Sequence, residues 1–389
     1  MYRKKITVTL SYYAIGFIML TSFEVKKFKN FEDVIKLDFK NISGHSFNKE
    51  CIENNIVKKA IIYGRNGVGK SNLGFAIFDI VSHLTDREDG IKAGFYRNYI
   101  NANFETLDIV EFKYEFLIEG RVVKYCYGKE DVETLVYEQL SIDGEEYLSI
   151  DRRDSSKAEI NFEGAETLKT DVSNSHISLV SYVDKNALLD LTDENKVFFK
   201  FIKFVKGMLF FRSLDQNRYI GYETGSRSIA ATIIEKGNLN DFEKFLNESG
   251  ILCSLAASET NDDILFVFKD KKIPFYDIAS TGTRTLALFY YWYQKLKIEE
   301  EVTFIYIDEF DAYYHHELAE TVVEKLKELP AQIILTTHNT TIMTNELLRP
   351  DCYFIMSKNS ISPLSQIVDK DLRFGHNIEK MYRAGAFDE

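Results

Sequence analysis

The stretch GRNGVGKS, residues 64–71, decides the fold of this chain. It matches the pattern GxxxxGK[ST], which forms a phosphate-binding loop when a strand precedes it and a helix follows it. Both neighbours are predicted: the apolar segment KKAIIYG (58–64) is typical of a short buried strand, and a helical pattern runs from Lys70 to about His83. The alternative, an ordinary glycine-rich turn, is disfavoured by this context. The sequence therefore predicts an α/β fold built around a P-loop.

A P-loop binds the phosphates of a nucleotide. Its glycines let the backbone curve around the phosphate groups, while its N–H groups and the following helix N-terminus supply positive potential. Lys70 is expected to reach the β- and γ-phosphates of ATP and to take part in catalysis, and the Ser71 hydroxyl is expected to bind Mg²⁺. ATP and Mg²⁺ are therefore the predicted ligands. The loop residues predicted to contact the nucleotide are Asn66, Gly67, Gly69, Lys70, Ser71 and Asn72.

Two further strand ends carry chemistry. Residues 304–309 read FIYIDE, in which Asp308 is expected to hold Mg²⁺ and Glu309 to act on water as the general base. Acidic strand ends are common, so it is the P-loop in the same chain that favours this interpretation. The next apolar strand ends in TTHNT (336–340), where His338 is expected to contact the γ-phosphate and to join Glu309 in catalysis. A capped loop or core histidine is the alternative.

A second anion-binding turn is predicted in ASTGTRTL, residues 279–286. This Ser/Gly-rich turn opens a helix, and a helix N-terminus attracts negative charge. One chain has no need of two γ-phosphate cradles at one nucleotide. Two chains placed head to tail do need them, because each offers its turn to the ATP bound by the other. The alternative is an N-capped helix without a ligand.

The order of these motifs resembles that of ABC-type ATPases. Within that class the chain is similar to the non-transporter group that includes SMC-like, RecF-like and OLD-family proteins. It resembles still more closely the predicted ATPases of bacterial abortive-infection and phage-defence systems, which carry an STGTR-like signature turn. The resemblance extends from Met19 onward and includes DEFDAYYHHEL (308–318) and the C-terminal stretches RPDCYFIM (349–356) and LRFGHNIEKMYRAGAF (372–387).

The resemblance implies partners as well as a fold. The first is a second copy of the chain, in an ATP-dependent homodimer or higher oligomer, and the other is a separate effector such as a nuclease or toxin. Asp311 falls where the family has a dimer-interface loop. For His315 and His316, a family role and a solvent-facing helix start stand as equal alternatives. The residues implied to contact the ATP of the partner are Ser280, Gly282 and Thr283.

The implied architecture is an α/β ABC-ATPase head with a mixed core sheet, an antiparallel β meander and a helical insertion. Alternating apolar residues predict the meander over 107–162. The run KVFFKFIKFVKGMLFF (196–211) belongs to the expected helical insertion, and its apolar side chains favour buried core or, alternatively, a partner-binding face. The predicted divisions are an N-terminal extension (1–18), an ATPase lobe with the P-loop and meander (19–183), the helical insertion (184–250) and an ATPase lobe with the signature turn, acidic strand and histidine (251–389).

The first 18 residues need separate treatment. Arg3, Lys4 and Lys5 precede an apolar run that resembles the start of a signal peptide, but no small-residue cleavage site follows. A run of about 15 residues is too short to span a bilayer easily. We therefore expect an upstream extension outside the fold, with a membrane anchor as the alternative, and no membrane partner.

Composition narrows the choice of function. The formal net charge of −12 argues against constitutive coating of nucleic acid, which needs a basic face, although a DNA contact restricted to one groove stays open. The four cysteines are scattered without metal-ligand spacing, as is typical of a cytoplasmic protein. The competing functions are a RecF-like DNA repair ATPase, a transporter's nucleotide-binding subunit, and a scaffold that binds ATP without turnover. The absence of an LSGGQ signature disfavours the transporter subunit. The presence of Glu309 and His338 disfavours a scaffold that binds ATP without turnover.

Overall fold

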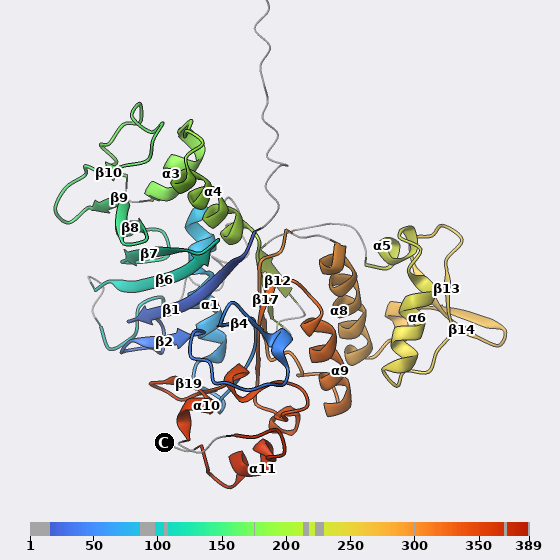
Figure 1. Ribbon diagram of the computed structural model, residues 1–389. Helices are drawn as coiled ribbons and strands as arrows, with labels where there is room; N and C mark the ends of the chain where they lie inside the picture. Colours follow the sequence, from blue (N-terminus) through green and yellow to red (C-terminus); the bar gives the residue numbers. More distant parts are fainter. Residues whose placement is uncertain are drawn as a thin grey trace, which may run out of the picture.

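The computed structural model of the chain has two large sheets with the P-loop helix between them and a smaller lobe to one side (Figure 1). The structure describes residues 16–85, 98–104, 108–174, 176–212, 218–221, 229–298, 301–368 and 372–387. Most of the predicted N-terminal extension lies outside these residues, so the extension stays a prediction. None of the described helices is both long enough and apolar enough to cross a bilayer.

The core sheet has seven strands in the order β12-β11-β16-β17-β5-β18-β19. Its five inner strands are parallel, and the two edge strands pair antiparallel with their neighbours. Every residue of β5 is buried, as expected for a parallel strand covered on both faces. The carboxyl ends of β5, β16 and β17 lie at one edge, where ligands bind in open α/β sheets. The strands are β5 (Lys59–Tyr63), β11 (Met208–Arg212), β12 (Arg218–Gly221), β16 (Phe304–Asp308), β17 (Gln332–Thr337), β18 (Tyr353–Met356) and β19 (Ile361–Pro363).

The second sheet is the predicted meander, extended by two N-terminal strands. Its order is β10-β9-β8-β7-β6-β1-β2, with antiparallel pairing throughout. The P-loop helix α1 (Lys70–Leu84) packs between the two sheets. On one side Tyr114 donates a hydrogen bond to the Ala76 carbonyl at 2.9 Å. On the other, a Cβ on Gly74 would lie 2.7 Å from the Tyr306 ring, so only glycine permits this approach. The strands are β1 (Ile18–Lys26), β2 (Ile35–Asp38), β6 (Val110–Ile118), β7 (Arg121–Lys129), β8 (Leu135–Ile142), β9 (Glu145–Asp151) and β10 (Glu159–Ile160).

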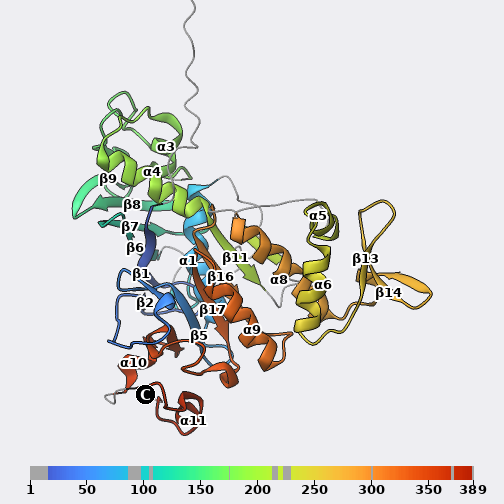
Figure 2. The same ribbon diagram turned by 45° about the vertical axis from the view of Figure 1, so that its right-hand side comes forward.

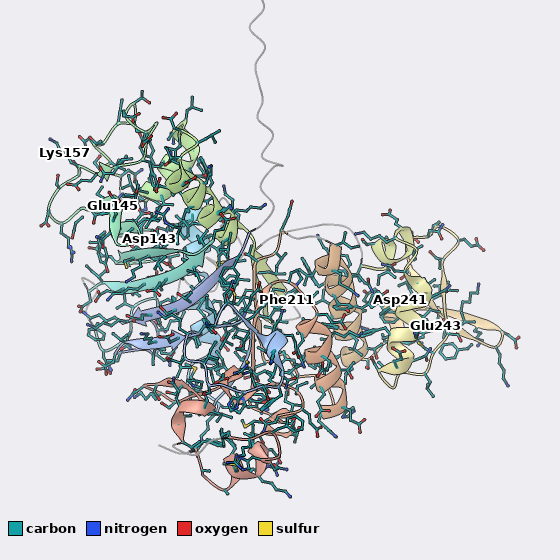
Figure 3. The ribbon with its side chains drawn as sticks, viewed as in Figure 1. Asp143, Glu145, Lys157, Phe211, Asp241 and Glu243 are labelled. Carbon is teal, nitrogen blue, oxygen red and sulfur yellow. The ribbon has the colours of Figure 1, made fainter. Side chains whose placement is uncertain are left out.

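A smaller lobe lies beyond α8 on the right of Figures 1 and 2. Its apolar residues form a core cluster of their own, and α8 contributes Leu286 and Tyr290 to that cluster but Trp292 to the main one. Tyr290 donates a 2.6 Å hydrogen bond to Asp241 of the lobe, and the Trp292 ring lies 5.3 Å from that of Phe211 in the core sheet. Figure 3 labels Asp241 and Phe211 on the two sides of α8. Helix α8 therefore packs against both the smaller lobe and the core sheet. The elements are α5 (Ile229–Glu235), α6 (Leu239–Glu248), β13 (Leu255–Ala257), β14 (Ile264–Phe268), β15 (Lys271–Pro274), α7 (Phe275–Ile278) and α8 (Thr281–Ile298).

The remaining elements cover the two sheets. Helix α3 contacts α1 and β9, and α4 contacts α1, β1 and β6. Helix α9 follows the acidic strand end and precedes β17, which completes a parallel strand–helix–strand unit. The bounds are β3 (Ile52–Glu53), β4 (Ile56–Val57), α3 (Leu179–Asn186), α4 (Asp193–Lys206), α9 (His316–Lys327), α10 (Leu364–Ile367), α11 (Ile378–Arg383) and the 3₁₀ turns Lys49–Cys51, Thr340–Ile342 and Pro350–Cys352.

The helical interpretation of residues 196–211 is wrong at its C-terminal end. Helix α4 ends at Lys206, and Met208 begins β11, which pairs in parallel with β16. Gly207 makes the change of direction, because a Cβ there would lie 2.3 Å from the Glu301 carbonyl oxygen. Most apolar residues of both elements are buried, and Phe199 and Phe211 are partly buried against the same core, so the core alternative is confirmed for this run. The segment predicted as a helical insertion thus also supplies a strand of the core sheet.

A buried polar cluster fixes α1 against the meander. Asp79 on α1 and Lys129 on β7 form a fully buried ion pair at 2.8 Å. Tyr99 and Tyr127 donate hydrogen bonds to the same carboxylate at 2.8 and 2.9 Å. A buried ion pair is tolerated only when its remaining hydrogen-bonding capacity is satisfied, which these hydroxyls do. The cluster therefore holds the orientation of the helix that begins at the P-loop.

We expect the fold to lose stability in mild acid through His83, in the last turn of α1. Burial, followed by the nearby Lys129 charge, holds the pKa of His83 well below its ordinary value. The folded state keeps the imidazole neutral, whereas the unfolded chain binds a proton near pH 6.5, so the free energy of unfolding falls as pH drops below that value. Between pH 7.5 and 5.5, His83→Gln should lose about 1 kcal/mol less stability than the wild type in urea unfolding.

The exposed His176 provides the matched control. His176→Gln should retain the wild-type dependence on pH, because it leaves the buried His83 in place. Equal pH dependence in the His83→Gln and wild-type proteins would contradict the assignment of a neutral buried imidazole.

Candidate nucleotide site

The P-loop occupies the turn between β5 and α1. Gly67 and Gly69 have φ values of 82° and 112°, a backbone region that favours glycine, and Gly69 is the N-cap residue of α1. Lys70 is buried, and its ammonium group donates a 2.8 Å hydrogen bond to the Gly64 carbonyl. The loop backbone and the helix N-terminus are therefore arranged as an anion cradle needs. The residues present fit a bound nucleotide phosphate.

Asp308, at the end of β16, is the buried carboxylate of the site. It accepts a 2.7 Å hydrogen bond from the Thr336 hydroxyl at the end of the neighbouring strand. Burial raises the pKa of Asp308, while hydrogen bonds from the Ser71 and Thr336 hydroxyls oppose that rise. A hydroxyl beside a carboxylate is a hard oxygen donor pair, and Mg²⁺ is usually held by one or two such ligands together with substrate phosphates. Ser71 and Asp308 therefore fit the metal predicted for them.

Glu309 is held in a defined orientation by three contacts. Its backbone N–H donates to the Thr336 hydroxyl at 2.9 Å. One carboxylate oxygen lies 3.3 Å from the Lys70 ammonium nitrogen, and the other lies 2.9 Å from Nδ1 of His338. The backbone φ of Glu309 is 48°, the left-handed region, which costs a non-glycine residue about 1–2 kcal/mol. Such strain concentrates at functional sites, and the three predicted catalytic side chains are in direct contact.

Asp311 is bound within its own chain. Its carboxylate accepts a 2.6 Å hydrogen bond from the Thr337 hydroxyl, and it is buried. Burial raises the pKa of Asp311, against hydrogen bonds from Thr337 and Asn339. The residue links the segment after β16 to the segment after β17. Its predicted place at a dimer interface stays a prediction. His315 and His316 are exposed where α9 begins.

Asn30 is a site residue that sequence analysis missed. In the turn between β1 and β2, its side chain donates to the Val68 carbonyl at 3.0 Å and accepts from the Asn72 amide at 2.6 Å. A Cβ on Gly69 would come within 2.5 Å of the Asn30 side chain and 2.7 Å of the Phe31 ring. The second sheet therefore closes over the P-loop. No spacing in the sequence links the two segments, since the contact arises from the packing of β1 beside the core sheet.

The signature turn forms the start of α8. The Ser280 hydroxyl accepts a 3.2 Å hydrogen bond from the Thr283 N–H, which caps the helix. Gly282 is closely packed, since a Cβ there would lie 3.0 Å from the Tyr313 carbonyl. Ser280, Gly282 and Thr283 line a pocket of about 430 Å³, together with His315 at the start of α9. None of the P-loop residues lines this pocket. In the described structure, the signature-turn residues therefore lie in a pocket apart from the P-loop residues, although both groups are predicted to contact ATP.

The fold and this site define the chain as a P-loop ATPase domain of the ABC type. The chain belongs to the family described as "AAA domain, putative AbiEii toxin, Type IV TA system", which matches residues 59–344. This match confirms the predicted relation to the ATPases of abortive-infection systems, and family membership indicates nucleotide and Mg²⁺ use in general.

Solved structures with a detectable likeness include SMC head domains. The SMC head domain from Thermotoga maritima is 16% identical, with a TM-score of 0.42, over 88% of this chain and 98% of that one. The Smc head domain with an extended coiled coil from Pyrococcus furiosus, bound to the C-terminal domain of ScpA, is 13% identical, with a TM-score of 0.43, over 89% and 96%. No curated protein matches this chain.

Proposed function

We propose that this chain is a cytoplasmic, Mg²⁺-dependent ATPase that closes as a head-to-tail homodimer around ATP and thereby regulates a separate effector in anti-phage defence. The observation that carries the ATPase is the contact of Glu309 with both Lys70 and His338 beside the P-loop. The defence role is supported by the family alone, because a fold does not define its biological process.

The chemistry follows from the positions of these side chains. The Glu309 carboxylate accepts a proton from water as the water oxygen bonds to the γ-phosphorus and the bond to the β–γ bridging oxygen breaks. Lys70 stabilises charge on the phosphate oxygens, and His338 orients the carboxylate through Nδ1. Bound Mg²⁺, held by Ser71 and Asp308, would supply neutralisation of phosphate charge. The other loop residues, Asn66, Gly67, Gly69 and Asn72, would position the phosphates.

The dimer is supported by the separation of the two anion-binding places. The turn that caps α8 lies in a pocket without P-loop residues, and under this proposal a second chain brings it to the P-loop to complete a nucleotide site. Under this proposal Ser280, Gly282 and Thr283 contact the γ-phosphate bound by the partner. Closure would depend on ATP, and hydrolysis would reopen the dimer, so the nucleotide controls which surface an effector meets.

Purification of Glu309→Gln protein with ATP and Mg²⁺, from cells that carry the neighbouring genes, tests whether the chain binds a separate effector. We expect one product of those genes to co-elute with the ATP-bound assembly at a fixed ratio. It should be absent when the same cells express Lys70→Ala. Mass measurement and peptide identification check both. An ATP-bound dimer that carries only DNA would instead support a RecF-like repair ATPase.

A further inference from the structure

The P-loop carries an exposed cation next to its first glycine. Arg65 lines a pocket of about 500 Å³ together with Lys358, and no acidic side chain lines that pocket. Both side chains are exposed, and neither has a carboxylate partner among the described residues. A basic pocket is unusual on a chain with a formal net charge of −12. The surface beside the P-loop is therefore poised to meet negative charge.

The pocket beside the signature turn is lined by side chains of the opposite charge. The pocket that contains Ser280 and Gly282 is also lined by Glu248 and Glu317, and neither lysine nor arginine lines it. Glu248 has a partner already, because Lys244 lies 3.6 Å away in the same helix. Among the described residues, Glu317 has His316 as its one ion-pair neighbour, at 4.0 Å, and its side chain is 87% exposed. Glu317 is therefore the carboxylate of this pocket with the most unused capacity for a cation.

We propose that, in the dimer, Arg65 of one copy pairs with Glu317 of the second copy, so that the two charges seat each P-loop against the opposite signature turn. This inference rests on the proposed head-to-tail dimer and names its docking contact. A twofold assembly contains the pair twice, so each substitution acts twice. Opposite charges across an interface also steer association and exclude a wrong register, and their attraction weakens with salt.

Charge reversal in the Glu309→Gln background tests the pair. With ATP and Mg²⁺, Arg65→Glu and Glu317→Arg should each weaken the dimer by at least about tenfold in analytical ultracentrifugation, since each places like charges together. The double variant should return to within about threefold of the parent. Glu320→Arg combined with Arg65→Glu is the matched control. Glu320 lies on the same helix but does not line the pocket, so no rescue is expected.

Arg65 belongs to the P-loop, so ATP binding by each monomeric variant is measured with a fluorescent ATP analogue. Glu317→Gln leaves the P-loop intact and should flatten the salt dependence of dimerisation. A parent that does not dimerise would overturn the proposed dimer and the pair together. A dimerising parent in which the double variant is no tighter than the two single variants, with unchanged salt dependence in Glu317→Gln, would overturn the pair alone.

Discussion

Replacement of Glu309 by glutamine is expected to lower the ATPase rate by about 10²–10⁴-fold while ATP binding persists. The amide keeps the size of the side chain and can still contact Lys70 and His338, but it cannot accept the proton of the attacking water. Because hydrolysis reopens the proposed dimer, the variant should accumulate as an ATP-bound dimer. Phosphate release measures the rate, and light scattering with bound-nucleotide analysis measures the assembly.

Two comparisons separate this effect from a damaged fold. Lys70→Ala should lose ATP binding, because it removes the buried ammonium group that contacts Gly64 and Glu309. Thr336→Val should give an intermediate loss, because it removes the hydroxyl that joins Asp308 to the Glu309 backbone. Wild-type turnover by Glu309→Gln would show that another group is the base, and the present assignment would then be wrong.

Local patterns were sufficient to predict which side chains meet at the candidate site. The P-loop, the acidic strand end and the histidine each follow an apolar strand, and β5, β16 and β17 are neighbours in the core sheet. Parallel strands bring their carboxyl ends to one edge, so the side chains after them meet there. That argument needs no knowledge of distances, which is why Lys70, Glu309 and His338 could be grouped from the sequence.

Other features depend on packing between distant segments. Asn30 reaches the P-loop only because β1 pairs with β6 while α1 lies against both sheets. The residue type does not predict the left-handed backbone of Glu309, because strain of this kind is imposed by surrounding contacts. The change from α4 to β11 was hidden because both elements are apolar and Gly207 alone separates them. Apolar runs of this kind are ambiguous between helix and strand.

The position of the signature turn is also a consequence of packing. Helix α8 joins the core clusters of the main body and the smaller lobe, so both fix the direction of its N-terminus. The turn itself was readable as a capped helix start with anion-binding character. What the pattern did not contain was its separation from the P-loop residues of the same chain. That separation is the observation that supports the proposed dimer.

Ser280→Arg is therefore expected to retain ATP binding by the monomer and to lose turnover by at least about 10²-fold, the scale of one lost transition-state contact. The added side chain would fill the space where Ser280 should meet the partner's γ-phosphate. Ser173→Arg is the matched control, since Ser173 is an exposed serine away from the signature turn and should tolerate the same change. Normal turnover by Ser280→Arg would remove the case for a shared site.

A mixture of two inactive variants tests the same shared site by recovery of ATPase activity. Ser280→Arg has an intact P-loop, and Lys70→Ala has an intact signature turn, so a heterodimer contains one complete site. Random pairing of equal amounts makes half of the dimers heterodimers, each with one of two sites complete, which limits recovery to about a quarter of wild-type activity. A site built within one chain predicts no recovery at any ratio. Recovery that rises with the concentration of the second variant therefore distinguishes a composite site from a monomeric one.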